Sequence, residues 1–376
     1  LKESLKIHLR SDVELGVQLS GGVDSSLVTA LSSQMTCKKL HSFSISFAEL
    51  EYDESEYQKR ISQRYNTEHH DYRMNEEIFT SIFEKSIWHY EHPLNDPNSV
   101  CAYYLALMAK KHITVMLSGE GADESFLGYA RFNPESVRNL KFRNFFYTHP
   151  SLRKILFNLW QLKKGKKLFN ITKYPPAMFT LTYADLNLVD ALLNGIFSEM
   201  KPRAEIAKFA KNDILTEAIL QDEICDLPQW FQRADKMGMA ASLEFRVPFC
   251  TPQIFTLANA IPYKLKVYNG ERKIILKKIA EKFMDKDQIY RKKIGFGTPI
   301  DTWINKTGKY ATLFEETINS NKFKTRDFIN QTHFKKIYSA HKDGSHKEIN
   351  SGFLWTYFNL ELWFRTFFEN GWKSFT

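Results

Sequence analysis

The sequence has few cysteines and no long hydrophobic run. No apolar stretch approaches the roughly 18 residues that a membrane span needs, and no signal peptide is recognisable at the start. We therefore expect a cytoplasmic protein without a membrane span. The four cysteines are scattered without a CxxC pair, which fits a reducing compartment, offers no zinc site and predicts buried or incidental thiols at Cys37, Cys101, Cys225 and Cys250.

The excess of positive charge lies in one segment. The 376 residues carry a net charge of +9, and residues 131–170 alone hold ten lysines and arginines against the single acid Glu135. Phe, Leu and Ile recur there at helical spacing, which favours a helix pair with a solvated lysine face over a nucleic-acid or membrane surface. We therefore do not expect nucleic acid as a partner, and the role of the segment stays open.

The stretch 15–30, LGVQLSGGVDSSLVTA, predicts a strand, a phosphate-binding loop and a helix. The paired glycines Gly21 and Gly22 let the backbone turn sharply, and the following helix offers N–H groups and the positive end of its dipole to an anion. The loop lacks the glycine spacing and the Gly-Lys-Ser/Thr end of a Walker A motif. A plain glycine turn capped by serines is the alternative, but the whole SGGVDSS after a hydrophobic strand favours a phosphate site.

Strands and helices alternate through the first 130 residues, which predicts an α/β fold with a parallel sheet and helices on both faces. Further strands are predicted at 41–47, 69–72 and 113–117. Ligands bind such sheets outside the carboxyl ends of the strands, where the loop at Ser20 and the SGEGADE loop at 118–124 both fall.

Two adjacent histidines, His69 and His70, lie on the third predicted strand. Neighbouring residues of a strand point to opposite faces of the sheet, so this pair cannot easily share one metal ion. We interpret both histidines as structural.

From Pro134 onward the pattern is helical, with charges among apolar residues in the stretch 229–249. Buried charges need partners, and ion pairs that brace a helix turn explain these as well as ligand contacts do. The charged residues are Arg233, Asp235, Glu244 and Arg246. Later lysines lie in 271–273, predicted to begin a helix, and in the glycine-bearing loop 291–297.

Four blocks recur in a recognisable order: LSGGVDSS at 19–26, LSGEGADE at 117–124, RADKMGMAASLEFRVPF at 233–249 and RKKIGFGTP at 291–299. Together they resemble the synthetase domain of asparagine synthetase B and related glutamine-dependent amidotransferases of the ATP pyrophosphatase family. The resemblance implies an adenine nucleotide α-hydrolase-like core with a mainly helical carboxyl-terminal part. It also implies a ligase that uses ATP to activate a carboxylate as an acyl-adenylate, forms an amide and releases AMP and pyrophosphate.

The same resemblance implies a division into an ATP-pyrophosphatase core, a basic helical insertion and a helical closing region that contacts acceptor and pyrophosphate, at 1–133, 134–225 and 226–376. It implies an amino-terminal glutaminase domain with a nucleophilic cysteine. Because this sequence begins at Leu1, inside an amphipathic helical pattern, we expect that domain to have been cleaved or to be encoded separately, and to supply the ammonia. We expect a homodimer as the assembly.

Roles carry over by matching position. The adenosine is expected to be flanked by Leu19, Ile45, Ser118 and Gly119. The phosphates are expected to contact Ser20, Gly21, Gly22, Asp24, Ser25, Ser26 and, as a second pyrophosphate contact, Lys273. Asp24 and Asp123 match the metal-binding aspartates, and magnesium prefers such hard oxygens. Glu120 matches the position linked to acyl-adenylate formation and to ammonia, and Lys293 matches the lysine that stabilises charge developing on the phosphates.

The acceptor segment departs from the family. Residues 96–102, DPNSVCA, contain no arginine, whereas the best-known bacterial asparagine synthetases carry a Thr- and Arg-bearing segment there that helps to hold aspartate. The usual Pro-Phe-Leu-Asp block reads PFCT at 248–251, although Thr can cap a helix as Asp does. The acceptor thus stays open between aspartate and a related carboxylate, with a sugar uronic acid of surface polysaccharide (O-antigen) synthesis as the alternative.

Three other functions are weighed against this one. A tRNA-modifying ATP pyrophosphatase shares the loop, but the paired cysteines are missing and the GEGADE and RKKIGFG blocks are present. A β-lactam-forming relative uses an internal amine and needs no ammonia. A non-catalytic scaffold is the weakest alternative, because Asp24, Glu120, Asp123 and Lys293 are all present.

Overall fold

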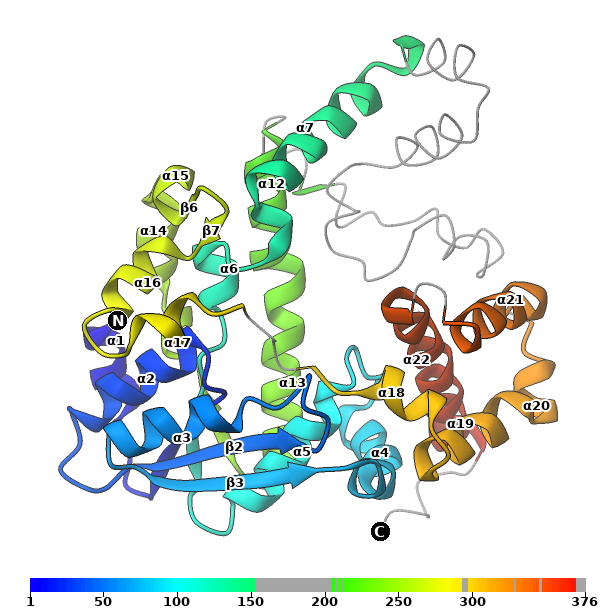
Figure 1. Ribbon diagram of the computed structural model, residues 1–376, viewed down its shortest axis with the longest axis horizontal. Coiled ribbons are helices and arrows are strands. Elements are labelled where there is room, and N and C mark those ends of the chain that lie inside the picture. Colours follow the sequence, from blue (N-terminus) through cyan, green and yellow to red (C-terminus); the bar gives the residue numbers. More distant parts are fainter. Residues whose placement is uncertain are drawn as a thin grey trace.

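Figure 1 shows the computed structural model, which describes residues 1–152, 205–206, 209–210, 213–292, 297–327, 329–344 and 347–369. The predicted catalytic Lys293 and residues 153–170 of the basic segment lie outside the described residues. Among the described helices, none combines the length and the hydrophobicity that a membrane crossing requires.

A five-stranded sheet forms the centre of the fold, and every neighbouring pair of strands is parallel, as predicted. The order across the sheet is β3-β2-β1-β4-β5. In the register, Gly16 of β1 is level with His41 of β2 and with Met116 of β4. The strands are β1 (Leu15–Gln18), β2 (His41–Phe47), β3 (Glu68–Met74), β4 (Val115–Leu117) and β5 (Glu244–Arg246).

The edge strand β5 comes from the second half of the chain and was not predicted. Two of its three residues are charged, so the apolar alternation that marks a strand is missing. The Arg246 side chain pairs with Glu244 at 2.7 Å and donates to the backbone carbonyls of His8 and Arg10, both at 2.7 Å. The end of the first helix thus provides the partners that let an arginine lie in this strand.

The sheet lies between two hydrophobic clusters because successive residues of β4 face opposite ways. Val115 and Leu117 belong to one cluster and Met116 to the other. The first is built with α1 (Lys2–His8), α2 (Val23–Ser33), α14 (Pro252–Ala260) and α16 (Ile274–Ala280). The second is built with α4 (Glu76–Tyr90), α5 (Asn98–Ala109), α18 (Ile300–Asn305), α19 (Lys309–Asn319) and α22 (Lys347–Phe364).

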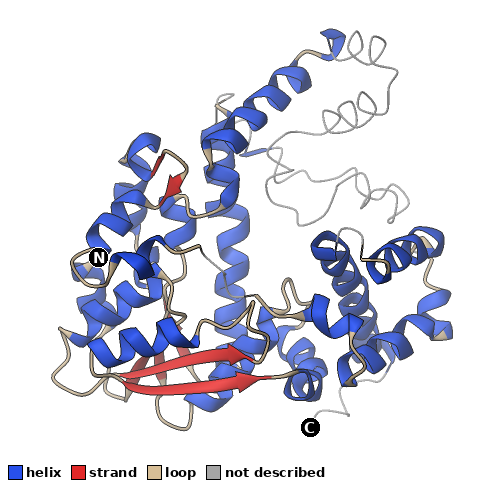
Figure 2. Cartoon of the chain, viewed as in Figure 1, coloured by secondary structure: helices blue, strands red, loops and turns tan. Residues whose placement is uncertain are grey.

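Helices predominate outside the sheet, as Figure 2 shows. The carboxyl-terminal helices gather beyond the arrowheads of β2 and β3, and α7 extends away from the sheet (Figure 1). The other α-helices of the described residues are α3 (Ser55–Arg64), α6 (Ala122–Phe126), α7 (Pro134–Thr148), α12 (Ile214–Gln221), α13 (Leu227–Met239), α15 (Tyr263–Lys266), α17 (Lys286–Tyr290), α20 (Asn321–Lys324) and α21 (Gln331–Lys342). Shorter turns are 3₁₀ at Ala130–Phe132 and Pro248–Cys250 and π at Asp222–Asp226 and Arg365–Glu369.

Two local expectations had different outcomes. Thr251 does cap α14, since its side chain accepts a hydrogen bond from the backbone N–H of Ile254. The stretch 271–273, predicted to begin a helix, instead forms β7 (Glu271–Arg272), which pairs with β6 (Val267–Tyr268) in an antiparallel hairpin. Lys273 follows as the N-cap of α16 in the left-handed region, with φ at 54°.

Candidate active site

The loops that follow β1 and β4 meet at the carboxyl edge of the sheet. Val17 is level with Leu117 in the register, so residues 20–26 and 118–124 face each other. They approach closely at Gly119, where an added Cβ would lie 2.8 Å from the backbone nitrogen of Ser25. A residue larger than glycine would force the two loops apart.

The loop after β1 has the geometry of an anion site. Gly21 has a positive φ of 75°, and Gly22 is the N-cap of the 11-residue helix α2, which has no side-chain cap. The backbone N–H of Ser20 donates to Ser25 Oγ at 3.1 Å, and the two hydroxyl oxygens lie 2.9 Å apart. The first N–H groups of α2 and the positive end of its dipole are therefore available to a phosphate.

Side chains from α17 and its flank hold the back of this loop. Gln288 Nε2 donates to the carbonyl of Gly21 at 3.2 Å, and Arg291 Nη2 donates to the same carbonyl at 3.3 Å. Arg291 also forms an ion pair with Glu54, and its guanidinium lies 4.2 Å from the ring centre of Tyr57. The RKKIGFG stretch thus anchors the phosphate loop through its arginine.

Three charged residues form an aspartate–lysine cluster: Asp24, Asp123 and Lys273. Lys273 Nζ lies 2.5 Å from Asp24 Oδ2 and 2.8 Å from Asp123 Oδ1. All three are largely buried, with side-chain exposures of 7% for Lys273, 17% for Asp24 and 19% for Asp123. The two aspartates, predicted from blocks almost 100 residues apart in the sequence, are therefore brought to one cation position.

The oxygens of the two aspartates in this cluster are of the kind that magnesium prefers. The ammonium group marks a point that both carboxylates reach, and Asp24 Oδ1 is buried with no hydrogen-bond partner in the described part of the chain. Magnesium is usually held by one or two carboxylates together with substrate phosphates, and the phosphate loop carries Asp24 itself. Asp24 and Asp123 are the residues that would hold the ion.

A group of buried polar residues adjoins the cluster through Glu124, which follows Asp123 in the sequence. Burial, and then the charge of Asp123, raises the pKa of Glu124 from its ordinary value of 4.5 to about 7, and Tyr129 donates a 2.5 Å hydrogen bond to this carboxyl group. Burial also raises the pKa of Asp222 to about 7, although Arg131 forms an ion pair with it at 2.7 Å. These residues link α6 to the π turn that precedes α13.

The Ser118 loop also contributes to a glutamate–arginine cluster, which consists of Glu120, Arg233 and Asp96. Arg233 Nη2 lies 2.7 Å from Glu120 Oε1, and its guanidinium lies 4.7 Å from the ring centre of Trp230. Burial lowers the pKa of Arg233, but the charges of Glu120 and Asp96 outweigh it and the net shift is upward. Glu120 Oε2 is buried without a hydrogen-bond partner among the described residues.

The segment expected to hold the acceptor contributes Asp96 to this cluster. Burial raises the pKa of Asp96, while Arg233 and the backbone N–H of Asn98, which donates at 2.7 Å, act in the opposite direction. Thr298 Oγ1 donates to Asn98 Oδ1 at 2.6 Å. The fourth sequence block, which contains Thr298, therefore contacts the acceptor segment.

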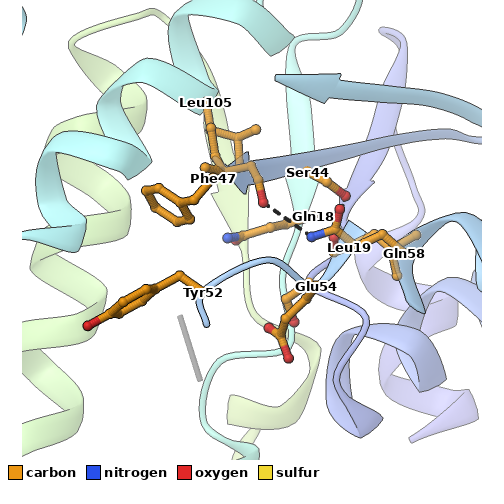
Figure 3. A pocket seen from close by; sticks show the side chains of 10 residues that line it. Gln18, Leu19, Ser44, Phe47, Tyr52, Glu54, Gln58 and Leu105 are labelled. Atoms are coloured by element: carbon orange, nitrogen blue, oxygen red, sulfur yellow. Dashed lines mark hydrogen bonds between the residues drawn. The ribbon is translucent and has the colours of Figure 1, made fainter. Parts of the chain in front are cut away.

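A pocket opens beside the phosphate loop at the carboxyl ends of β1 and β2 (Figure 3). Gln58 Nε2 donates to the carbonyl of Ile45 at 3.2 Å, and Ser44 Oγ donates to the carbonyl of Leu19. The pocket combines apolar walls with a few polar groups, as small-molecule sites generally do. Its lining is Gln18, Leu19, Ser20, Ser44, Ile45, Phe47, Tyr52, Glu54, Gln58 and Leu105.

The sequence-predicted residues gather at this edge of the sheet. Leu19 and Ile45, expected beside adenosine, line the pocket, whereas Ser118 and Gly119 are absent from its lining. Ser26, expected beside the phosphates, is fully buried in α2. The roles assigned to these residues stay predictions. Sequence reasoning missed Glu54, Gln58 and Gln288, since they lie outside the four blocks.

The sequence model of the family described as asparagine synthase matches residues 1–365. Over 376 aligned residues the chain is 29% identical to asparagine synthetase (glutamine-hydrolyzing) 1 of Bacillus subtilis strain 168, an alignment that covers 96% of this chain and 57% of that protein. A putative asparagine synthetase (glutamine-hydrolyzing) of Mycobacterium bovis is 27% identical, with 98% of this chain and 57% of that protein covered.

Similarity to a third relative is higher over a shorter stretch. The chain is 35% identical over 205 residues to putative asparagine synthetase (glutamine-hydrolyzing) 2 of Methanocaldococcus jannaschii, which covers 53% of this chain and 39% of that protein. The chain thus spans little more than half the length of the first curated relatives that it matches.

Proposed function

The chain belongs to the asparagine synthase family, and from that premise we propose that it is a ligase that converts a carboxylate to an amide with cleavage of ATP to AMP and pyrophosphate. One observation carries the proposal most strongly. Asp24 of the phosphate loop and Asp123 of the loop that carries Glu120 both pair with Lys273, at 2.5 and 2.8 Å. A nucleotide and a second reacting group could therefore meet there.

The nucleotide would lie across the carboxyl ends of β1 and β2. The pocket beside Leu19 and Ile45 would take the adenosine, and the loop at Gly21 and Gly22 would take the phosphates. Magnesium held by Asp24 and Asp123 would neutralise phosphate charge. Lys273, which already lies between the two aspartates, would contact the pyrophosphate.

In the first step an oxygen of the acceptor carboxylate attacks the α-phosphorus. The bond from that phosphorus to the oxygen bridging the α- and β-phosphates breaks, and pyrophosphate leaves with the bonding electrons. Since the leaving group carries several negative charges, catalysis is mostly positioning and charge neutralisation. Lys273 supplies one positive charge, and we assign a second to Lys293 from its sequence block.

In the second step ammonia attacks the acyl carbon and the bond to AMP breaks. The nitrogen must lose a proton, and Glu120 is the carboxylate at this position that can accept it. Its Oε1 is held by Arg233 at 2.7 Å, whereas its Oε2 has no partner within the described ranges. We propose that Arg233 orients Glu120 and leaves Oε2 to receive the proton.

The acceptor is a small carboxylate. Arg233 supplies positive charge beside the acceptor segment, although that segment has no arginine of its own. The buried Asp96 adds a negative charge, which suits an acceptor with a cationic amino group such as aspartate. A sugar uronic acid lacks that group and is the alternative.

The proposal is tested by incubating the purified chain with ATP, magnesium, ammonium and a panel of carboxylic acids that includes aspartate and uronic acids. We expect one acid to trigger equimolar release of pyrophosphate and AMP and to yield its amide. Glutamine should not replace ammonium, because the glutaminase cysteine would come from another domain. Pyrophosphate release that no acid stimulates, or release that a tRNA stimulates instead, would contradict the proposal.

A further inference from the structure

A second cluster of ligating side chains lies at the amino ends of β2 and β3, whereas the candidate active site lies at the carboxyl ends of the strands. The register places His41 level with Glu68 and Phe43 level with His70. Since residues two apart on a strand share a face, the side chains of His41, Glu68 and His70 emerge on one face of neighbouring strands. These are the tails of the two arrows in Figure 1, away from the candidate active site.

The adjacent His69 points the other way, as its position on the strand predicts. Its Nδ1 lies 3.0 Å from Ser42 Oγ, on the opposite face. The expectation that His69 and His70 do not share one ion therefore agrees with the structure. It considered only neighbours in the sequence, however, and the partner of His70 is His41 on the next strand.

Three ligand atoms form a compact triangle. His41 Nδ1 lies 3.2 Å from His70 Nε2, and Glu68 Oε1 lies 3.8 Å from His41 Nδ1 and 3.6 Å from His70 Nε2. Tetrahedral zinc with bonds of about 2.0–2.1 Å separates its ligand atoms by about 3.3–3.4 Å. Octahedral magnesium would separate them by only about 3 Å and prefers oxygen ligands. The observed spacing and the two imidazoles both favour the zinc-type site.

The surroundings hold the imidazoles while leaving one side open. The His70 ring stacks on Phe43 with 4.8 Å between ring centres, and the His112 ring centre lies 4.1 Å from that of His70. The side chains of His41 and His70 are only 18% and 16% exposed, whereas that of Glu68 is 50% exposed. An ion could therefore enter from the Glu68 side and keep a water molecule as its fourth ligand.

We propose that His41, Glu68 and His70 bind one divalent transition-metal ion of the zinc class, separately from the predicted magnesium site. β3 is one of the two edge strands of the sheet, and the ion would join it to β2 at the amino ends of both strands. Binding to the folded state alone stabilises that state, so the ion would act as a structural clamp on this edge.

The test measures binding of Zn²⁺ alone to the full chain. The titration is made by calorimetry in excess Mg²⁺, which occupies carboxylate sites, and in a Cys37→Ser background, which removes an exposed thiol. We expect one equivalent to bind with a dissociation constant of about 10 µM or lower and to raise the melting temperature. Co²⁺ should give the visible absorption of a tetrahedral site.

Matched variants distinguish this site from any other. His41→Gln and His70→Gln should each weaken Zn²⁺ binding at least about tenfold, the scale for disturbing a metal site, and should abolish the thermal shift. His69→Gln should bind like the parent. Glu68→Gln, a substitution at a half-exposed position that leaves the core intact, should also weaken binding. No binding at about 100 µM Zn²⁺, or equal affinities in the Glu68, His69 and His70 variants, would overturn the proposal.

Discussion

The aspartate–lysine cluster and the glutamate–arginine cluster are neighbours on one loop, yet they are built differently. The first brings two carboxylates to one ammonium group and adjoins an open phosphate loop. The second pairs Glu120 with Arg233. It also contains the buried Asp96, which lies in a segment that departs from the family pattern. The first is the cluster proposed to bind the phosphates and magnesium, and the second is the one proposed to contact the acceptor.

This difference indicates where specificity for the acceptor could change while the use of ATP is kept. Asp24 and Asp123 both pair with Lys273, so we expect a change in either one to disturb the whole cluster. Asp96 acts on Arg233 through charge, and its segment can vary while Arg233 still orients Glu120. We therefore expect substitutions in the first cluster to abolish ATP use and those in the second to alter the amide step or the acceptor.

The largest effect should come from the aspartates. Asp24→Asn and Asp123→Asn each remove an anionic ligand while keeping the side-chain shape, and each should lower pyrophosphate release by about 10³-fold or more at limiting magnesium. Asp285→Asn is the control, since its ion pair with Arg64 is exposed and surface pairs contribute little. Normal release by either cluster variant would remove the metal assignment.

Lys293→Ala should have the next largest effect. A cation that stabilises charge developing on pyrophosphate favours the transition state over bound ATP, so turnover should fall by about 10²-fold while ATP affinity changes only a few fold. Lys293→Arg should rescue poorly, because a planar guanidinium does not replace a compact ammonium. The neighbouring Lys292 is exposed, and Lys292→Ala should keep a near-normal rate. Equal losses at both lysines would show that only general positive charge matters.

Arg233→Met should separate the two steps. Without its partner, Glu120 would lose its orientation, and amide formation from ammonia should fall by about 10–100-fold. Pyrophosphate release should fall less, because the aspartate–lysine cluster is untouched. Rapid-quench measurements of pyrophosphate and amide in one reaction compare the two steps directly. Parallel loss of both products would place Arg233 in the adenylation step as well.

Asp96→Asn should identify the acceptor. If the buried carboxylate holds an α-amino group, its loss removes one charged hydrogen bond and should raise the KM for aspartate about tenfold. The KM for ATP should stay within about twofold, since the pocket lining lies elsewhere. A uronic acid acceptor has no amino group, and its KM should not rise. The steady-state constants of the parent and the variant distinguish these outcomes.

Sequence patterns predicted the parallel sheet and the two facing loops because each depends on contiguous residues. The strand at Glu244–Arg246 was missed, since its charges are satisfied by carbonyl groups at the far end of the first helix. The sequence marked Arg233 as a charged residue among apolar ones, but it did not decide whether Arg233 forms an internal ion pair or contacts a ligand. Only the fold places it beside Glu120, 113 positions away in the sequence.

Contacts between residues distant in the sequence were also missed at the phosphate loop and at the histidines. The glycines that turn the loop were recognised, but Gln288 and Arg291, which hold the carbonyl of Gly21, lie more than 260 positions away. The pairing of His41 with His70 depends on strand register, which a single sequence does not determine. Local backbone chemistry was therefore predictable, and side-chain partners across the fold were not.

The smallest effect should be on stability, at the carboxyl group behind the aspartate–lysine cluster. The pKa of Glu124 is raised by burial and by Asp123 from 4.5 to about 7. Below about pH 4.5 the group is protonated in both the folded and unfolded states. Between about pH 4.5 and 7 the unfolded chain releases a proton that the folded chain keeps, so the free energy of unfolding falls as the pH rises. Above about pH 7 the carboxyl group is ionised in both states, and the free energy of unfolding stays at its lowered value.

Glu124→Gln tests this directly, because an amide oxygen can still accept the hydrogen bond from Tyr129 but cannot ionise. The variant should match the parent near pH 4.5 and exceed its unfolding free energy by about 1–3 kcal/mol at pH 8. Melting temperatures across that range should fall less steeply for the variant, with a remaining slope from Asp222. Asp96→Asn offers the comparison in the other cluster: burial raises the pKa of Asp96 while Arg233 lowers it, so this variant should also exceed the unfolding free energy of the parent at pH 8. A Glu124→Gln variant with an unchanged melting profile and lost turnover would instead give Glu124 a part in catalysis.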